Sequence, residues 1–217
     1  MSEGLVLEGV SISHGTRRIV GVDCRVGAGE IVTLMGPSGS GKSTLLAFLT
    51  GTLPPVFTAR GRVLLGGQDV TVRPPAARGI GILFQDALLF PHLSVGENLA
   101  FGLKRGGSRA ARRARVEAAL RDVGLDGFAD RDPATLSGGQ KARAALMRTL
   151  LAEPSALLLD EAFSSLDAAR RDQVRGLVFA RAVAQRLPVL MVTHDPGDAA
   201  AANGPVICLD GPPPERL

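Results

Sequence analysis

The sequence predicts an α/β fold built around a parallel sheet, and three observations lead to that prediction. Apolar runs at Ile31–Met35, Ala156–Asp160 and Val189–Thr193 are nearly continuous instead of alternating. Strands with that pattern are buried on both faces, as in parallel sheets covered by helices. Helix-like stretches separate several of the runs, and a glycine-rich segment, Gly36–Ser43, joins the first run to a helix. This combination is typical of α/β domains.

The other elements follow in chain order from apolar periodicity and from residues that stop helices. We expect further strands at Leu5–Val10, Arg62–Leu65, Ile80–Phe84 and Val206–Leu209. We expect helices at Lys42–Thr50, Arg109–Val123, Gly139–Ala152 and Asp167–Arg186. Gly51 stops the first helix and Pro154 follows the third. The section from residue 87 to residue 154 contains no strong strand and is therefore predicted to be a helical insert.

The composition excludes several classes of protein. Of the 217 residues, 45% are hydrophobic, which is too many for a disordered chain. Only 4% are aromatic, without Trp or Tyr, which argues against a nucleic-acid binder that stacks bases on aromatic rings. The net charge is +4. We expect the arginine cluster, meaning the arginines between residues 105 and 115, to be a solvated helix face; a patch for nucleic acid or lipid is the alternative. The cluster comprises Arg105, Arg109, Arg112, Arg113 and Arg115.

The segment Gly36–Ser43 fits the pattern G-x-x-x-x-G-K-[ST] between a predicted strand and a predicted helix, the context that a phosphate-binding loop requires. Its glycines let backbone N–H groups point inward at phosphate oxygens, and the following helix presents its positive N-terminal end. Lys42 would bring a charge to the β- and γ-phosphates and Ser43 a hydroxyl to Mg²⁺. A glycine-rich turn that fits by chance is the alternative, and the strand–loop–helix context argues against it.

Two carboxylates, Asp160 and Glu161, follow an apolar run. In phosphate-loop enzymes an Asp at a strand end holds Mg²⁺, and a second carboxylate can orient or deprotonate the attacking water. Successive side chains along a strand point in different directions, so the two residues can do different jobs. Without the phosphate loop, the pair would be interpreted as a helix N-cap beside a solvated acid. With it, a catalytic role is favoured.

The segment Leu136–Gln140, with the sequence LSGGQ, stands before a predicted helix. Ser137 can cap that helix and the two glycines expose backbone donors, which makes a second anion-binding helix start. One chain has little use for a second phosphate site that differs from the Gly36–Ser43 loop unless the second site faces another chain. On these residues the chain resembles the ATP-binding-cassette (ABC) ATPases, in which LSGGQ is the family signature. Other family motifs follow in order: Gln85 matches the Q-loop glutamine, Ser164–Asp167 the D-loop and His194 the switch histidine.

The resemblance implies a role for each matching position. ATP would be held at its triphosphate by the phosphate loop, namely Gly36, Ser38, Gly39, Ser40, Gly41, Lys42, Ser43 and Thr44. Mg²⁺ and its water would be arranged by Ser43, Gln85 and Asp160. Catalysis would use Lys42, Gln85, Glu161 as the base and His194 at the γ-phosphate. In a head-to-tail dimer the opposite subunit's site would be completed by Ser137, Gly138, Gly139, Gln140 and Asp167.

Two positions depart from the family pattern. The family often has an aromatic residue upstream of the loop lysine that stacks on adenine; the nearest match here is His14, whose imidazole offers less area. An exposed turn histidine is the alternative interpretation. The family commonly has proline after the catalytic glutamate, where this chain has Ala162. That change is expected to loosen the turn without abolishing the chemistry.

The family also implies an architecture. We expect a P-loop NTPase (RecA-like) core with an antiparallel β subdomain and an inserted helical subdomain, together forming a single ABC ATPase domain over residues 1–217. The catalytic core would comprise residues 1–86 and 155–217, and the helical subdomain residues 87–154.

The sequence further indicates which kind of ABC ATPase this is. No run of about 18 apolar residues is present, so no membrane span is expected, and no secretory signal is visible. Two Cys and three His leave no CxxC site for the zinc-binding insert of DNA-repair relatives. The runs Pro74–Gly79 and Gln85–Leu99 resemble short bacterial solute-importer ATPases of the thiamine, sulfate and iron group. We therefore expect an ATPase subunit on the cytoplasmic face of the inner membrane. Its partners would be integral-membrane permease subunits, a second copy of itself and a periplasmic substrate-binding protein, with no nucleic acid.

Two alternatives stay open for the function. One is the ATPase of a lipoprotein-export or cell-division complex, and the other is a non-transport regulatory ATPase that binds nucleic acid through the arginine cluster. Two interpretations also stay open for Leu88–Phe90: these residues could form a groove that receives a permease helix, or they could pack within the helical subdomain.

Overall fold

The structure is a computed structural model that describes residues 4–209. These residues form two compact units. Unit 1 comprises residues 4–80, 155–161 and 182–209 of the described chain, and unit 2 comprises residues 81–154 and 162–181. Strand β6 (Ile80–Phe84) and helix α5 (Ala168–Ala184) each have residues in both units. The phosphate loop belongs to unit 1 and the LSGGQ segment to unit 2.

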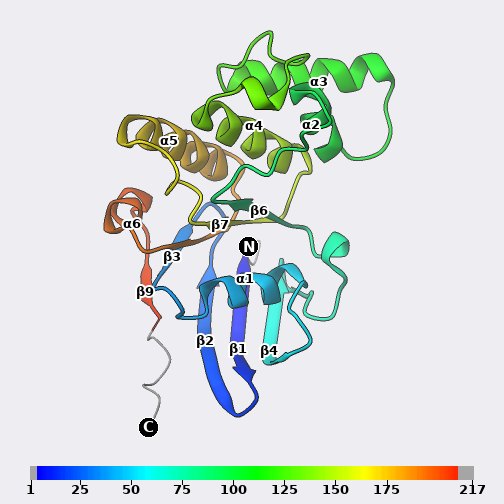
Figure 1. The fold of residues 1–217 in the computed structure, drawn as a ribbon. Coiled ribbons are helices and arrows are strands. Elements are labelled where there is room, and N and C mark those ends of the chain that lie inside the picture. Colours follow the sequence, from blue (N-terminus) through cyan, green and yellow to red (C-terminus); the bar gives the residue numbers. More distant parts are fainter. Residues whose placement is uncertain (1–3, 210–217) are drawn as a thin grey trace. The chain divides into compact units, whose positions relative to one another are not determined.

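Unit 1 contains a parallel sheet, which confirms the first prediction from the sequence (Figure 1). Its strands lie in the order β7 (Ala156–Asp160), β8 (Val189–Thr193), β3 (Ile31–Met35) and β9 (Val206–Cys208). Strand β8 pairs in parallel with both β7 and β3, and all of its side chains are buried. The three nearly continuous apolar runs are therefore the three adjacent strands β7, β8 and β3, with the bounds that the sequence predicts.

Unit 1 also contains an antiparallel sheet, in the order β2 (Arg17–Val26), β1 (Leu5–His14), β4 (Phe57–Leu65) and β5 (Gln68–Asp69). The sequence does not predict strand β2, and β1 and β4 are longer than expected. The cause is solvent exposure: β2 lies at the sheet edge and carries three arginines, so its apolar alternation is weak. Helix α1 (Lys42–Thr50) contacts both β2 and β7, so it packs against both sheets of the unit.

The C-terminal end of α1 is held by a buried arginine that follows a short 3₁₀ helix, Pro75–Ala77. The Arg78 side chain lies at 6% exposure, and its Nη1 donates hydrogen bonds of 2.7 and 2.9 Å to the carbonyl oxygens of Phe48 and Leu49. The same guanidinium donates to the carbonyls of Thr71 and Arg73. Burial lowers the pKa of Arg78. A positive group thus lies at the negative end of the helix that begins with Lys42.

We expect Arg78→Met to lower the free energy of unfolding of the chain by about 2–3 kcal/mol, because hydrogen bonds from a charged donor are strong and their carbonyl partners would be left unpaired. Urea unfolding followed by circular dichroism measures this. Arg73→Met is the matched control, since the Arg73 side chain is exposed and its Nη2 donates to the exposed Gln68. Equal unfolding midpoints for the two variants would contradict the role given to Arg78.

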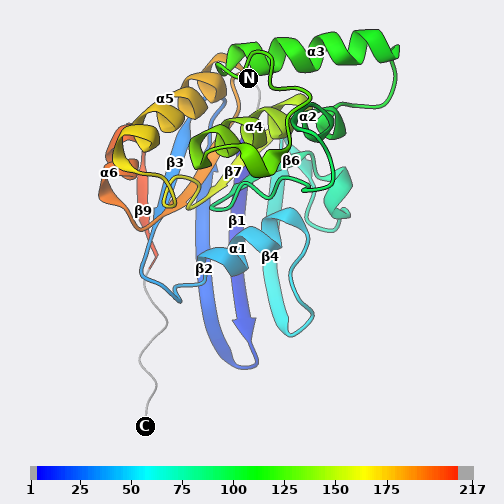
Figure 2. The ribbon, with the colours of Figure 1, turned by 45° about the horizontal axis from the view of Figure 1, so that its top comes forward.

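Unit 2 is helical, and its helices α2 (Val95–Gly102), α3 (Arg109–Asp122) and α4 (Gly138–Leu151) pack side by side (Figure 2). A 3₁₀ helix at Pro133–Thr135 precedes α4. No strand lies between residues 87 and 154, all of which the structure describes, as the sequence predicts. Helix α2 was not expected. Its signal was the capping box Ser94–Glu97, in which each side chain accepts a hydrogen bond from the other residue's backbone N–H.

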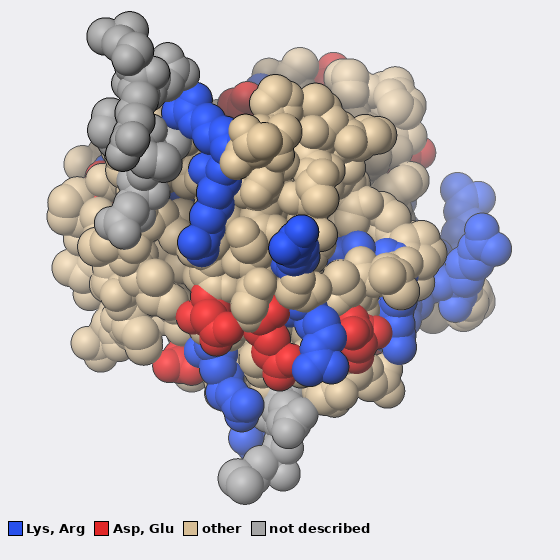
Figure 3. All heavy atoms as spheres, turned by 90° about the horizontal axis from the view of Figure 1, so that it is seen from below, with Lys and Arg blue, Asp and Glu red and all other residues tan. Residues whose placement is uncertain are grey.

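Most of the arginine cluster is bonded within unit 2. Arg113 pairs with Glu117 and Asp130 at 2.8 and 3.1 Å, and Arg115 pairs with Glu153 at 2.9 Å. Figure 3 draws another face, seen from below Figure 1, on which acidic side chains lie beside several basic ones and the basic side chains form no single continuous surface. None of the helices formed by residues 4–209 has the length and apolar character that crossing a bilayer requires. The last short helix, α6 (Pro196–Ala202), follows β8.

Candidate active site

The carboxyl ends of three neighbouring strands bring the unit 1 motif residues together. The phosphate loop follows β3, Glu161 follows β7, and His194 follows β8. Parallel pairing in the order β7, β8, β3 puts these three ends at the same edge of the sheet. That edge is where open α/β sheets bind their ligands. Sequence reasoning predicted the residues, and the strand order explains why they meet.

The phosphate loop is shaped by a glycine at the start of α1. Gly41 has φ 86°, a left-handed conformation that suits glycine, and an added Cβ would lie 2.8 Å from the Cβ of Val20. Lys42, which is 7% exposed, folds back over the loop, and its Nζ donates hydrogen bonds of 2.7 and 2.8 Å to the carbonyl oxygens of Gly36 and Pro37. The ammonium group is thereby fixed at the loop.

One hydroxyl of the loop is buried without a partner. Ser40 is 0% exposed, and within residues 4–209 its Oγ has no hydrogen-bond partner. Buried polar groups are normally hydrogen-bonded, so an unpaired one inside a phosphate loop fits an oxygen supplied by a ligand. Ser43, by contrast, is exposed at the start of α1. Its hydroxyl is accessible to a cation.

The two carboxylates after β7 have different environments. Burial and the negative charge of Glu161 raise the pKa of Asp160, while Lys42 acts in the opposite sense. Glu161 has φ 46°, a conformation that is uncommon for a residue with a side chain. Its Oε2 lies 3.2 Å from Nδ1 of His194, and its backbone N–H donates to the carbonyl of Val192 at 3.0 Å. The glutamate is therefore turned toward the residue after β8.

These residues fit Mg²⁺ bound together with a nucleotide. Mg²⁺ takes oxygen ligands and is usually held by one or two carboxylates together with water and substrate phosphates. Asp160 and the exposed hydroxyl of Ser43 are groups of that kind, and a cation would relieve the unfavourable charge at Asp160. Among residues 4–209, no group of three or more His, Cys, Asp or Glu side chains could hold a metal ion.

His14 lies at the exposed end of β1, in the same unit as the phosphate loop. It pairs across the sheet with Phe57, and the two rings are 5.6 Å apart at an interplanar angle of 58°. Sequence reasoning missed Phe57, because its place beside His14 depends on the register between β1 and β4. The two rings together offer more aromatic surface than the imidazole alone.

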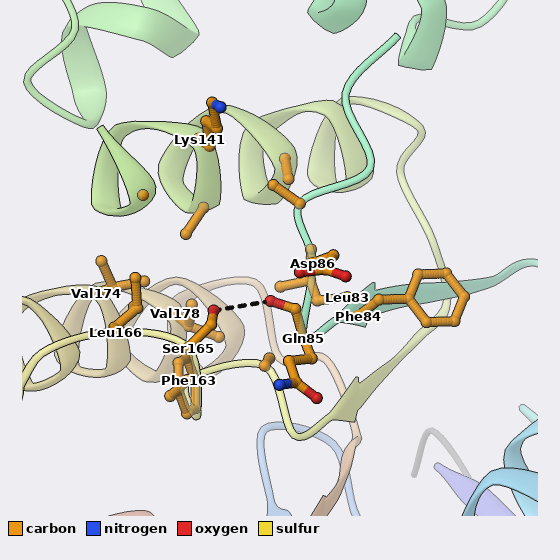
Figure 4. Close-up of a pocket in the computed structure, with 15 residues that line it drawn as sticks. Leu83, Phe84, Gln85, Asp86, Lys141, Phe163, Ser165, Leu166, Val174 and Val178 are labelled. Carbon is orange, nitrogen blue, oxygen red and sulfur yellow. Dashed lines mark hydrogen bonds between the residues drawn. The ribbon is translucent and has the colours of Figure 1, made fainter. Parts of the chain in front are cut away.

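In unit 2 the structure brings the Q-loop, signature and D-loop segments around one cavity of about 250 Å³ (Figure 4). The carbonyl oxygen of Gln85 accepts a hydrogen bond of 3.1 Å from Oγ of Ser165. Gly138 and Lys141 of α4 line the same cavity. The sequence does not predict that these three segments meet.

The LSGGQ segment forms the start of α4, with Ser137 as its N-cap. The backbone N–H of Gln140 donates to Ser137 Oγ at 3.4 Å, and the backbone N–H of Ser137 donates to Gln140 Oε1 at 2.9 Å. Gly138 and Gly139 are thus the first residues of a capped helix. Asp167 lies before α5, where its side chain accepts from the backbone N–H of Arg170 at 3.1 Å.

Comparisons with known proteins identify the family of the chain. Residues 19–164 match the family described as ABC transporter. The chain is 52% identical over 186 residues to "Uncharacterized ABC transporter ATP-binding protein YnjD" of Escherichia coli (strain K12), covering 86% of each chain. It is 42% identical over 210 residues to "Thiamine import ATP-binding protein ThiQ" of Rhizobium meliloti (strain 1021), covering 96% of this chain and 87% of that protein. It is also 42% identical over 209 residues to "Sulfate/thiosulfate import ATP-binding protein CysA" of Thermosynechococcus vestitus, covering 95% of this chain and 61% of that protein.

Proposed function

This chain belongs to the ABC transporter family and is an ATPase, and from that premise we propose that it powers a separate membrane permease that imports a solute. The observation that carries the enzymatic part of the proposal is the gathering of Lys42, Asp160, Glu161 and His194 at the carboxyl edge of one sheet. The nucleotide-binding core would be RecA-like. The catalytic core would comprise residues 1–86 and 155–217 and the helical subdomain residues 87–154.

The proposed ATP site uses the phosphate loop for the triphosphate. Backbone N–H groups from Gly36 to Thr44 and the start of α1 would surround the phosphates, with Ser40 Oγ donating to a phosphate oxygen. Ser38 and Gly39 belong to the same loop. Ser43, Asp160 and Gln85 would hold Mg²⁺, which supplies charge neutralisation at the β- and γ-phosphates. His14, with Phe57 beside it, would stack on the adenine.

The proposed chemistry is attack of water on the γ-phosphorus. Glu161 accepts a proton from the water as its oxygen forms the new bond to phosphorus. The bond from phosphorus to the bridging β–γ oxygen breaks, and ADP leaves with the electron pair. Lys42 stabilises the charge on the transferred group, and His194, fixed by its contact with Glu161, faces the γ-phosphate. The 3.2 Å contact between Glu161 and His194 supports a joint role for the two.

The signature residues support a proposed second half of the site. A capped helix start with two glycines exposes N–H groups and a positive dipole, which suits the γ-phosphate of an ATP bound to another copy. We propose that two copies associate head to tail with ATP between them. In that dimer each copy would supply Ser137, Gly138, Gly139, Gln140 and Asp167 to the site of the other.

Import is favoured over the lipoprotein-export, cell-division and regulatory alternatives by the relatives. Those named for thiamine, sulfate/thiosulfate and Fe(3+) ion import are 42%, 42% and 44% identical to this chain, respectively. The ATPase would lie on the cytoplasmic face of the inner membrane, attached through its permease, with a periplasmic substrate-binding protein in the complex. We propose that the chain has no nucleic-acid partner, because Arg113 and Arg115 of the arginine cluster are already paired with acidic side chains of the same unit.

An exposed apolar surface in unit 2 supports the permease as partner. We define the docking patch as Leu88, Phe90 and Phe101. Leu88 and Phe101 are 56% and 69% exposed, and the rings of Phe90 and Phe101 are 4.8 Å apart. Contiguous exposed apolar side chains commonly mark protein interaction sites. A permease helix that covers this patch would link the membrane partner to the segment that follows Gln85.

We expect Leu88→Asp to prevent co-purification of the chain with the membrane proteins encoded beside it, because a charge placed at an apolar anchor costs about 2 kcal/mol or more. Leu88 has φ 44°, a conformation that Asp tolerates, so the variant should fold and keep the basal ATPase rate of the free chain. Val72→Asp, at a 94% exposed apolar position of unit 1, is the control and should co-purify normally. Normal co-purification of Leu88→Asp would exclude the patch as the docking site.

A further inference from the structure

The segment from Gln85 to Leu88 is held by hydrogen bonds more than by packing. Leu83, Phe84, Gln85, Asp86 and Ala87 line the cavity of about 250 Å³ in unit 2, so one side of the segment meets a hollow (Figure 4). Leu88 has the left-handed φ of 44°, which is unfavourable for a leucine. A segment in such a position needs specific partners to keep its conformation.

Arg148 of α4 supplies two of those partners. Its Nη1 donates to the carbonyl oxygen of Leu88 at 2.8 Å, and its Nη2 donates to that of Ala87 at 3.3 Å. Its guanidinium carbon also lies 5.3 Å from the centre of the Phe90 ring, within the range of a cation–π contact. Burial lowers the pKa of Arg148. The planar guanidinium bridges two carbonyls at once, which a point charge such as a lysine ammonium would do less well.

Arg148 also lies where two helices touch. An added Cβ on Gly102 would collide with the carbonyl oxygen of Arg148, so the backbones of α2 and α4 meet at this point. Asn98 of α2, which is fully buried, accepts from the backbone N–H of Phe90 at 2.7 Å and donates to its carbonyl at 3.1 Å. The segment and the docking patch are thus fixed to α4 by Arg148 and to α2 by Asn98.

The other end of α4 is the signature turn. The helix runs without a break from Gly138 to Leu151, and Ser137 caps it. A helix moves as a stiff body, so a displacement near Arg148 is passed along α4 to Ser137. A partner that covers Phe90 and Phe101 would press on the ring against which the guanidinium of Arg148 lies.

We propose that Arg148 is a positioning residue that couples the 85–88 segment to α4, so that docking on the patch of Leu88, Phe90 and Phe101 sets the position of the signature turn. The claim that docking sets the position of the signature turn rests on the proposed function, because the signature turn acts only in the ATP-bound dimer. The claim that Arg148 couples the 85–88 segment to α4 concerns the free chain alone. Arg148 is given no role at the nucleotide or the attacking water; its contacts are with Ala87, Leu88 and Phe90, and it acts through α4.

The test compares Arg148→Gln, Arg148→Lys and a matched control, Arg112→Gln. Arg112 of α3 also donates to backbone carbonyls, those of Lys104, Ala100 and Gly106 at 2.7, 2.9 and 3.4 Å, and none of them belongs to the 85–88 segment. Hydrogen exchange is measured on the nucleotide-free full chain. In Arg148→Gln the carbonyls of Ala87 and Leu88 lose a charged donor, so the segment should open more often. The amide of Phe90, which follows that segment and donates to Asn98, should then exchange about tenfold faster, and amides 138–141 should also exchange faster. In Arg112→Gln only amides near 100–107 should change, because Arg112 bonds the carbonyls of Ala100, Lys104 and Gly106.

The second measurement uses the same variants in a Glu161→Gln background and follows dimer formation with MgATP by size-exclusion chromatography. Arg148→Gln should require about tenfold more MgATP for dimer formation, with partial recovery in Arg148→Lys, while binding of a fluorescent ATP analogue to the monomer stays within about twofold of the Glu161→Gln parent. A structural defect without a positioning role would lower both binding and dimer formation together. If Arg148→Gln is unstable, the Arg148→Lys variant carries the comparison.

Three outcomes would overturn the proposal. They are an unchanged Phe90 amide in Arg148→Gln, unchanged exchange at 138–141, and an equal MgATP requirement for the Arg148→Gln and Arg112→Gln chains. Failure of the Glu161→Gln parent itself to form a dimer would instead contradict the proposed head-to-tail dimer, and with it the claim that docking sets the position of the signature turn. The exchange data would then still decide whether Arg148 couples the segment to α4.

Discussion

Glu161→Gln is expected to reduce ATP turnover by about 10²–10⁴-fold while leaving MgATP binding intact, because the amide keeps the shape of the carboxylate but cannot accept the proton of the attacking water. The position of Glu161 supports this choice of base. Its left-handed φ of 46° and its 3.2 Å contact with His194 turn it toward the carboxyl end of β8. With hydrolysis blocked, the variant should accumulate as an ATP-bound dimer.

Steady-state phosphate release and size-exclusion chromatography, with and without MgATP, measure both effects. Glu8→Gln is the matched control, since Glu8 is a half-buried glutamate of unit 1 paired with Arg62 at 2.6 Å. It should hydrolyse ATP at the parental rate. A Glu161→Gln chain that turns over normally would exclude Glu161 as the base, and one that remains a monomer with MgATP would contradict the head-to-tail dimer.

Lys42→Ala should lower the rate of ATP hydrolysis by about a hundredfold or more, because it removes the positive charge that stabilises the transferred phosphoryl group. Lys42 is 7% exposed and is fixed at the loop by the carbonyls of Gly36 and Pro37, so its charge is held at a defined place. Lys104, an exposed lysine paired with Glu153, provides the control variant Lys104→Ala. Phosphate release by Lys42→Ala at the parental rate would show that the loop is not the ATP site.

The buried parallel strands were the elements that the sequence predicted best, whereas an exposed edge strand and a short helix were missed. The parallel strands β3, β7 and β8 have the predicted bounds because both faces are covered and the apolar runs are nearly continuous. Strand β2 was missed because it is an edge strand with exposed arginines, and helix α2 because it has only eight residues. Local patterns of this kind carry little periodicity, although the Ser94–Glu97 capping box marked the start of α2.

The candidate site divides in a similar way. The phosphate loop and the LSGGQ turn could be predicted because the groups that give each its chemistry are neighbours in the sequence. These groups are the glycines, the start of the helix that follows and, for LSGGQ, the residue that caps it. The contact of Glu161 with His194 could not, because it depends on β7 and β8 being neighbours in the sheet. The contacts of Arg78 and Arg148 were not predicted: each side chain binds backbone carbonyls of a distant segment, and such carbonyls are common to all residues and form no sequence pattern.

Magnesium-dependent hydrolysis of ATP at the phosphate loop can be measured as the rate of phosphate release by the purified parental chain, against MgATP concentration and again with excess EDTA. We predict slow, saturable release that stops when Mg²⁺ is removed, because Ser43 and Asp160 are suited to a cation that neutralises the β- and γ-phosphates. Phosphate release no faster than in buffer, or release that continues unchanged in EDTA, would contradict this assignment.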